Sequence, residues 1–161
     1  MQPTRLKFAV AALALLPAMA PAETLTAAVT WNDLHAITVN QFTNFAKYLD
    51  NATDGEMTME VYTNSSLLPP RSALQGIADG IAQYGHVTSA YVPADLPLDN
   101  VLNDIAFNAD DQLAAAFAQT EIKALHPKLQ EEYKNKGVVF AASYSTNPYI
   151  YICATPIRTL T

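Results

Sequence analysis

The sequence predicts an α/β fold in which a mostly parallel sheet is flanked by helices. Residues 24–31 and 57–62 alternate apolar and polar side chains, which is the period of a half-buried strand. Residues 37–49 and 73–81 repeat apolar side chains every three or four positions, as amphipathic helices do. This order of strand, helix, strand and helix is typical of parallel strands joined by helical crossovers. The 161 residues are enough for one domain with a hydrophobic core.

Residues that favour helix ends and turns mark the boundaries of these first four elements. Asn32 and Asp33 are favoured caps ahead of the first helix, and residues 53–55, Thr-Asp-Gly, stop it. Residues 64–66, Asn-Ser-Ser, turn the chain after the second strand. Two prolines at 69–70 begin the second helix, because proline is tolerated in a first turn.

The second helix leads into a third predicted strand over residues 84–91. In open α/β sheets, ligands bind in the crevice beyond the carboxyl ends of the strands. Thr88, Ser89 and Tyr91 are therefore candidate ligand contacts. The same residues also fit a buried strand that ends in hydroxyl side chains, and both interpretations stay open at this point.

The second half of the chain has weaker patterns. Residues 93–97 are typical of a loop, and the apolar segment 98–107 fits no single element. Residues 148–154 are extended in character and aromatic.

A long helix is expected in this half, from a cap at Asp110 or Asp111 to Gly137, and Pro127 is the place for a kink. Residues 138–142 then predict one more strand.

The first 22 residues predict a secretory signal peptide. Arg5 and Lys7 precede an apolar core over residues 8–16, and the small residues around Pro21 predict cleavage after Ala22. Residues 23–161 then form the domain, with a net charge of −8 in place of −6. So acidic a chain is a poor candidate for binding nucleic acid. Since no other apolar run approaches the roughly 20 residues of a membrane helix, we expect a periplasmic protein without membrane insertion after cleavage.

The sequence offers no constellation for catalysis, metal binding or a cofactor. His35, His86 and His126 lack the spacing of a zinc site, and the single Cys153 has no partner cysteine. No nucleophile elbow, P-loop or dinucleotide fingerprint is present. Residues 131–132, both glutamate, are interpreted as an exposed helix face.

Aromatic side chains at the expected loop edges favour a binding crevice over a catalytic one. They are Trp31, Tyr91, Tyr149 and Tyr151. His35 lies close enough in sequence to Trp31 to line the same pocket. For each of these residues, packing in the core or at its rim is the alternative interpretation.

Several phrases in a fixed order resemble one protein family. They are FTNFAKYLDNATDG at 42–55, VYTNSSLL at 61–68, IADGIAQYG at 77–85, SAYVP at 89–93 and PIRTLT at 156–161. Together these phrases resemble the dicarboxylate-binding type of solute-binding protein from TRAP (tripartite ATP-independent periplasmic) transporters.

The resemblance implies a type II periplasmic-binding-protein fold, in which two α/β lobes close on a ligand. Residues 23–161 correspond to the first lobe, and the chain is expected to end near the first crossover. The implied function is a periplasmic receptor that delivers an organic acid to a membrane permease. An arginine that clamps the ligand carboxylate is expected beyond Thr161, in the second lobe.

The resemblance also implies first-lobe contacts at three places, which here hold Thr30-Trp31, Thr88-Ser89 and residues 147–149 with Asn147 and Tyr149. The sialic-acid branch of the family has a glutamate and an arginine where this chain has Thr88 and Tyr149. A smaller or more apolar acid is therefore favoured. The alternatives are an extracytoplasmic sensor module, and a secreted α/β enzyme, for which the sequence offers no nucleophile.

Overall fold

In the computed structural model, which describes residues 22–104 and 111–144, three parallel strands form a sheet in the order β2-β1-β3. The strands are β1 (Glu23–Ala28), β2 (Met57–Tyr62) and β3 (Tyr84–Gly85). β1 pairs with β2 along its whole length, whereas β3 pairs only with Ala27 and Ala28. The predicted α/β fold with a parallel sheet is confirmed.

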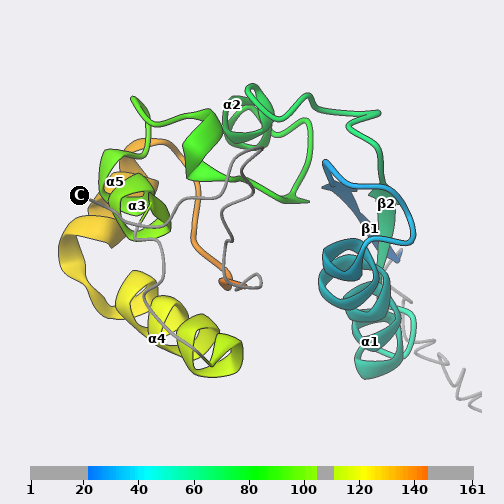
Figure 1. The fold of residues 1–161 in the computed structure, drawn as a ribbon. Coiled ribbons are helices and arrows are strands. Elements are labelled where there is room, and N and C mark those ends of the chain that lie inside the picture. The colour runs from blue at the N-terminus through cyan, green and yellow to red at the C-terminus, as the bar shows by residue number, and fades with distance from the viewer. Residues whose placement is uncertain (1–21, 105–110, 145–161) are drawn as a thin grey trace, which may run out of the picture.

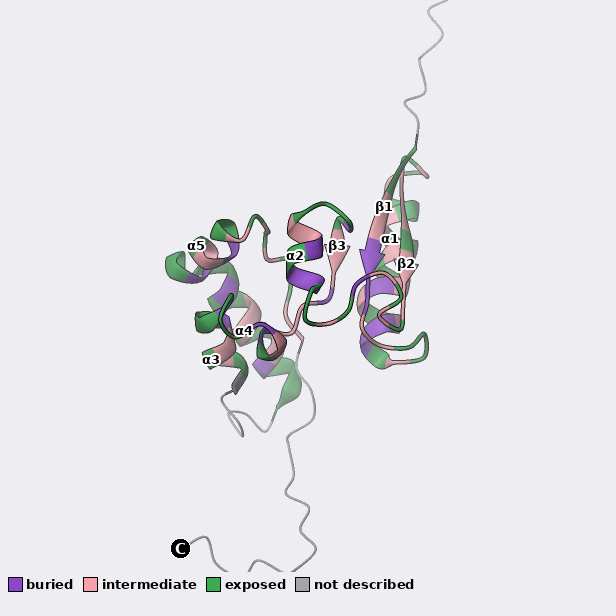
Figure 2. Ribbon diagram, turned by 90° about the horizontal axis from the view of Figure 1, so that it is seen from above, coloured by how far each residue is buried: buried purple, intermediate pink, exposed green. Residues whose placement is uncertain are grey.

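Helices lie on both sides of this small sheet. They are the π-helix η1 (Thr38–Thr43), α1 (Asn44–Ala52), α2 (Ala73–Ala78), the 3-10 turn η2 (Ser89–Tyr91), α3 (Pro97–Asp104), α4 (Gln112–Leu125) and α5 (Pro127–Asn135). Figures 1 and 2 both place α1 beside β1 and β2, and α3, α4 and α5 together on the other side of α2. No helix in the described ranges has the length and apolar character needed to cross a bilayer.

The core lies at the carboxyl end of the sheet. Burial along β1 rises from the exposed Glu23 to Ala27, which is fully buried (Figure 2). Phe42 of η1 packs against this end, and burying such a ring stabilises a fold by about 1.5–3 kcal/mol. A second cluster joins Leu74 of α2 to Leu129 of α5. The core therefore consists of separate clusters, one at the sheet and one between α2 and α5.

Gly85 allows a close approach where β3 joins the sheet. A Cβ at this position would lie 2.6 Å from Ile77 Cδ1 and 3.2 Å from the carbonyl oxygen of Ala28. A larger residue would have to displace the end of the Ile77 side chain and press on the Ala28 carbonyl, so glycine favours this close approach of α2 and β1.

The elements of the first half match the predictions with some shortening. β2 covers the predicted 57–62, and α1 ends before the predicted stop, where Gly55 has φ +81°. β1 ends at Ala28 rather than at Trp31. The second helix covers only Ala73–Ala78 of the predicted 69–81, because Gly80 takes φ +79° and ends the turn.

The predicted third strand over 84–91 is wrong beyond Gly85. β1 has itself ended at Ala28, and the amide of His86 makes the last sheet bond, to the Ala28 carbonyl at 3.0 Å. The chain then turns, and Ser89–Tyr91 form η2.

Three further differences lie in the second half. Residues 98–104 of the segment that fitted no single element form α3 together with Pro97, which was predicted to end a loop. The long helix is two helices: Asp111 caps α4 by accepting bonds from the amides of Leu113 and Ala114, and Pro127 begins α5. Residues 138–142 form no strand among the described residues. Val138 bonds instead to the Tyr133 carbonyl at the end of α5.

Candidate functional site

A cavity of about 210 Å³ lies along β3 and the segment that follows it. Residues 83–89 form one wall and residues 138–144 another, with side chains from α2, α3, α4 and α5 between them. Ligand pockets are commonly about 300–1,000 Å³ in volume, so this one is sized for a small molecule. Its position at the carboxyl end of a parallel strand is where open α/β sheets bind ligands.

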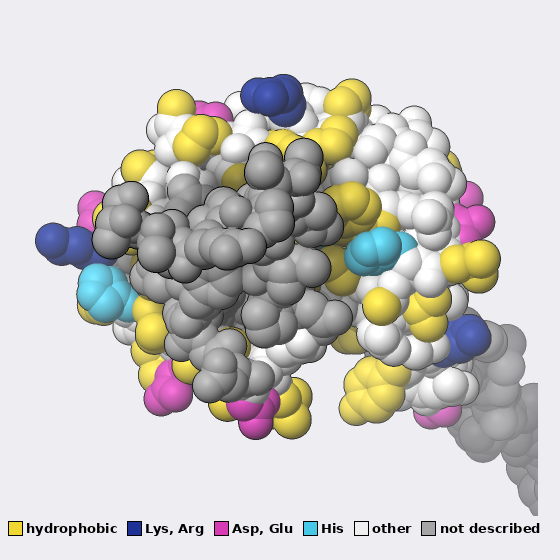
Figure 3. All heavy atoms as spheres, in the orientation of Figure 1, with side chains coloured by type: hydrophobic (Ala, Val, Ile, Leu, Met, Phe, Trp, Pro, Cys, Tyr) yellow, Lys and Arg dark blue, Asp and Glu magenta, His cyan; other side chains and the backbone are white. Residues whose placement is uncertain are grey.

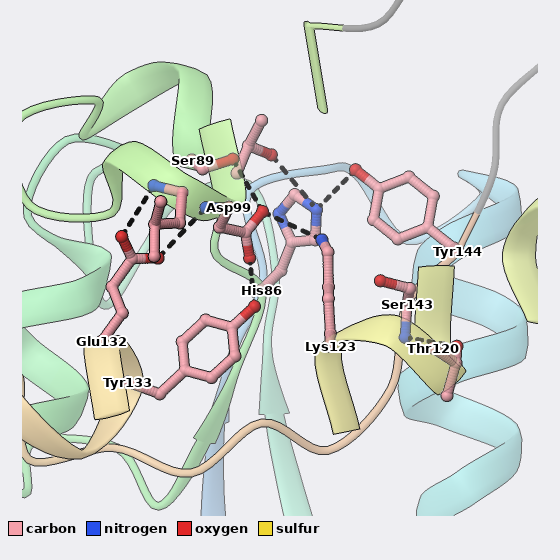
Figure 4. A network of polar contacts seen from close by, with 11 residues as sticks. His86, Ser89, Asp99, Thr120, Lys123, Glu132, Tyr133, Ser143 and Tyr144 are labelled. Atoms are coloured by element: carbon pink, nitrogen blue, oxygen red, sulfur yellow. Dashed lines mark hydrogen bonds and ion pairs between the residues drawn. The ribbon is translucent and has the colours of Figure 1, made fainter. Parts of the chain in front are cut away.

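An aromatic group lies at the sheet side of this cavity. The ring of Trp31 stacks on His35, with ring centroids 4.8 Å apart and planes 17° apart, and its centroid lies 5.9 Å from that of His86. His86 Nε2 is 2.9 Å from the Tyr144 hydroxyl and 3.5 Å from Thr88 Oγ1 (Figure 4). His86 therefore joins the predicted contacts Trp31 and Thr88 into one group.

His86 is neutral at physiological pH. Only 6% of it is exposed, and burial, with a smaller contribution from His35, lowers its pKa from 6.5 to about 4. Two buried nitrogens of this group, His86 Nδ1 and Trp31 Nε1, have no hydrogen-bond partner among the described residues. Because buried polar atoms are nearly always paired, this group has spare hydrogen-bonding capacity for a ligand.

A buried polar network lies at the helical side of the same cavity. Asp99 Oδ1 accepts bonds from Ser89 Oγ at 3.0 Å and from Lys123 Nζ at 2.9 Å, and Asp99 Oδ2 accepts one from the Tyr133 hydroxyl at 2.5 Å (Figure 4). Burial, with a further contribution from Asp99, raises the pKa of Tyr133 far above its usual value. Glu132 holds the start of α3 by accepting bonds from the amides of Leu98 and Asp99.

This network places one cation in the cavity, together with the Asp99 carboxylate that pairs with it. Lys123 is the one lysine or arginine that lines it within the described residues, and it is 7% exposed. On the face shown in Figure 3, the basic side chains lie apart from one another and form no patch. In the described part of the chain, no three His, Cys, Asp or Glu side chains come close enough together to hold a metal ion.

The structure brings together some of the predicted site residues. Thr88 and Ser89 line the cavity, although the Ser89 hydroxyl is turned to Asp99. Trp31 and His35 are not among the lining residues, but Trp31 contacts His86, which is, and His35 stacks on Trp31. Tyr91, in η2, is not among the lining residues.

Of the three other predicted contacts, only Thr30 lies within the described residues. The backbone carbonyl of Thr30 accepts a bond from Ser65 Oγ at 3.3 Å, which fixes the turn after β1. Asn147 and Tyr149 lie outside the described residues, as does Cys153.

Sequence reasoning missed His86, Asp99 and Lys123 as site residues. His86 stands two positions before Thr88, so strand alternation places both on one face, and that signal was available. Asp99 and Lys123 gave no signal, because charged residues on amphipathic helices are usually solvated. The glutamate pair at 131–132 is not a purely solvated face either, since Glu132 caps α3.

The lowered pKa of His86 predicts a loss of stability in acid. The unfolded chain binds a proton near pH 6.5 and the folded chain only near pH 4. Stability is therefore complete above about pH 6.5 and falls as the pH drops toward 4, by about 3 kcal/mol in total. Urea unfolding of the protein and of its His86→Gln variant between these pH values measures this difference. Parallel pH profiles for the two proteins would contradict the assignment.

Comparison with known proteins finds one family. The model of the bacterial extracellular solute-binding proteins, family 7, matches residues 28–160. Comparison with curated proteins gives no match.

Several solved structures are similar. DctP7, a Bordetella pertussis extracytoplasmic solute receptor binding pyroglutamic acid, is 25% identical, with a TM-score of 0.60 over 73% of this chain and 38% of that one. A TRAP periplasmic solute binding protein from Desulfovibrio salexigens is 24% identical, with a TM-score of 0.61 over 68% and 34%. A TRAP solute binding protein from Rhodoferax ferrireducens, in complex with copurified benzoate, is 16% identical, with a TM-score of 0.62 over 70% and 34%. The chain thus spans little more than a third of the length of these proteins.

Proposed function

The chain belongs to family 7 of the bacterial extracellular solute-binding proteins, and on this premise we propose that it captures a small organic acid in the periplasm and delivers it to a TRAP-type membrane permease. The family is one of binding proteins rather than enzymes. The proposal includes no catalysed reaction and no cofactor.

The observation that carries this proposal is the cavity at the carboxyl end of β3. It combines a neutral, buried histidine, a threonine hydroxyl and a nearby stacked Trp31–His35 pair. A carboxylic acid with a ring or a short chain has the matching chemistry, because its oxygens accept hydrogen bonds and its carbon skeleton packs on aromatic faces.

The ligands of solved relatives support the same class. DctP7 binds pyroglutamic acid, a Bordetella bronchiseptica protein has bound mandelate, and a Polaromonas protein is bound to D-erythronate. All are small carboxylates. We propose Trp31, His35 and Thr88 as ligand contacts in this chain, with Thr30, Ser89, Tyr91, Asn147 and Tyr149 as further members of the site.

Titration with a panel of acids tests the proposal. The panel contains pyroglutamate, mandelate, benzoate, D-erythronate and D-galacturonate, with glucose and glycerol as uncharged controls. We expect at least one acid to bind in calorimetry or NMR at up to millimolar concentrations, and His86→Phe to weaken that binding. Binding of the uncharged controls alone would contradict the proposal.

The proposed export to the periplasm predicts a defined amino terminus. Arg5, Lys7 and the apolar core over 8–16 form a signal peptide that is cut after Ala22. Mass spectrometry of periplasmic protein is expected to find Glu23 as the first residue. A precursor that retains residues 1–22 in the cytoplasm would contradict this expectation.

Delivery to a permease predicts the partner. A TRAP permease has one small and one large membrane subunit, and genes for such a pair are expected beside the gene of this chain. A neighbouring signalling receptor without permease genes would favour the sensor alternative.

A further inference from the structure

Lys123 places a cation inside an acidic protein. The chain without residues 1–22 has a net charge of −8, yet the ammonium of Lys123 is buried and lines the cavity. Lysine is almost never buried unless it is paired, so its presence here requires a reason. Asp99 supplies the pairing, at 2.9 Å.

In the Asp99–Lys123 ion pair, the lysine ammonium has N–H groups left for further hydrogen bonds, whereas the aspartate oxygens already accept three. Asp99 accepts from Ser89 and Tyr133 as well as from Lys123, so its charge is shared among three donors. The Lys123 ammonium has three N–H groups, and Asp99 is its one acceptor among the described residues. The Phe140 ring, whose centroid is 5.9 Å from Nζ, borders the same charge. Within the described residues, the other two N–H groups of Lys123 have no acceptor and are available to a ligand.

A second observation indicates that the cavity is built for a polar ligand. His86 Nδ1 is buried, belongs to a residue that is 6% exposed and lines the cavity, and has no partner among the described residues. Since unpaired buried polar atoms are rare, a ligand oxygen or a water has to satisfy it. Both His86 and Lys123 line this cavity, and Figure 4 shows the two side chains near the centre of the polar network.

We propose that Lys123 binds the carboxylate of the ligand and that Asp99 is the positioning residue that holds its ammonium in place. The inference rests on the proposed function and names the first-lobe group that makes the cavity selective for anions. Charge-assisted hydrogen bonds of this kind are about twice as strong as neutral ones. Removing the ammonium is therefore expected to weaken acid binding about 10- to 100-fold.

The test removes both charges of the pair. Lys123→Met alone would leave Asp99 buried without its cation and can prevent folding. The double variant Asp99→Asn/Lys123→Met has no unpaired charge, and its asparagine still bonds to Ser89 and Tyr133. The matched control is Asp95→Asn/Lys136→Met, which removes a pair of the same 2.9 Å length at the exposed surface. The two double variants have the same net charge.

The acid panel is titrated into the parent chain and both double variants, with circular dichroism to verify the fold. The amide of the acid that binds best serves as an uncharged probe. We expect the Asp99/Lys123 variant to bind the acid 10- to 100-fold more weakly and the amide as the parent does, and the Asp95/Lys136 variant to match the parent.

Unchanged acid binding by the folded Asp99/Lys123 variant would overturn the role of Lys123 and leave the proposed function intact. Equal loss of acid and amide binding would assign Lys123 a purely structural role. Failure of every panel acid to bind the parent would overturn the proposed function, and this inference with it.

Discussion

Replacing Asp99 with alanine is expected to destabilise the fold by about 3–5 kcal/mol. Asp99 is 8% exposed, and its carboxylate accepts bonds from Ser89, Lys123 and Tyr133. The substitution leaves the Lys123 ammonium buried without a counterion and two hydroxyl donors without an acceptor. Each of these groups then loses its hydrogen bonds without regaining those it makes to water in the unfolded chain.

The exposed pair of Asp95 and Lys136 provides the control. Its 2.9 Å separation equals that of the buried pair, but the two side chains are 51% and 37% exposed. Exposed pairs contribute at most about 1 kcal/mol, so Asp95→Ala is expected to have a small effect. Urea unfolding of the two variants measures both values. Similar losses of stability would mean that the buried network does not hold the α3–α4–α5 region together.

Extending the chain to the length of its solved relatives is expected to tighten acid binding by about 10- to 100-fold. The present chain covers 34–38% of those proteins, and the family resemblance implies a second lobe that closes over the ligand. An arginine from that lobe would add charge-assisted hydrogen bonds, typically about 1.5–3 kcal/mol. The first lobe keeps Lys123, so we expect it to retain weak binding that prefers anions.

Calorimetry of the processed chain and of the longer form with the same acid panel tests this expectation. The two forms are compared for each acid and for its amide, so that a change in charge selectivity is separated from a change in affinity. Equal affinity of the two forms would mean that the first lobe contains the whole site and that no arginine beyond Thr161 takes part.

The sequence was sufficient to predict the fold wherever neighbouring residues decide the structure. The alternation over 57–62 predicted β2 at its observed bounds, and Thr-Asp-Gly at 53–55 ended α1. These elements depend on side-chain period and on residues that adopt turns, which are local properties.

Structure that depends on distant partners could not be predicted in this way. The start of α3 is capped by Glu132, which lies 34 residues from Leu98, so the segment 98–107 carried no cap of its own to identify. Residues 138–142 have the composition of a strand. The Val138 amide instead donates to the Tyr133 carbonyl at the end of α5, and the Ser143 amide, one residue beyond the segment, donates to Thr120 Oγ1.

The same distinction applies to the residues of the candidate site. Thr88 and Trp31 were predicted near the ends of strands, where the topology of a parallel sheet brings side chains to one edge. Asp99 and Lys123 are 24 positions apart on two helices, and only the packing of both α3 and α4 against α5 buries them together. A buried ion pair leaves no periodic signal in a sequence, so the charge in the cavity could only come from the structure.

A crystal structure of the protein with the panel acid of highest affinity is the most direct test of the central claim, that this cavity is an organic-acid site. We expect the carboxylate within hydrogen-bond distance of Lys123 Nζ and a ligand oxygen or a bridging water at His86 Nδ1. The carbon skeleton is expected to pack against the rings of Trp31 and His86. An acid that binds in solution but lies elsewhere on the protein, with the cavity holding only water, would contradict the claim.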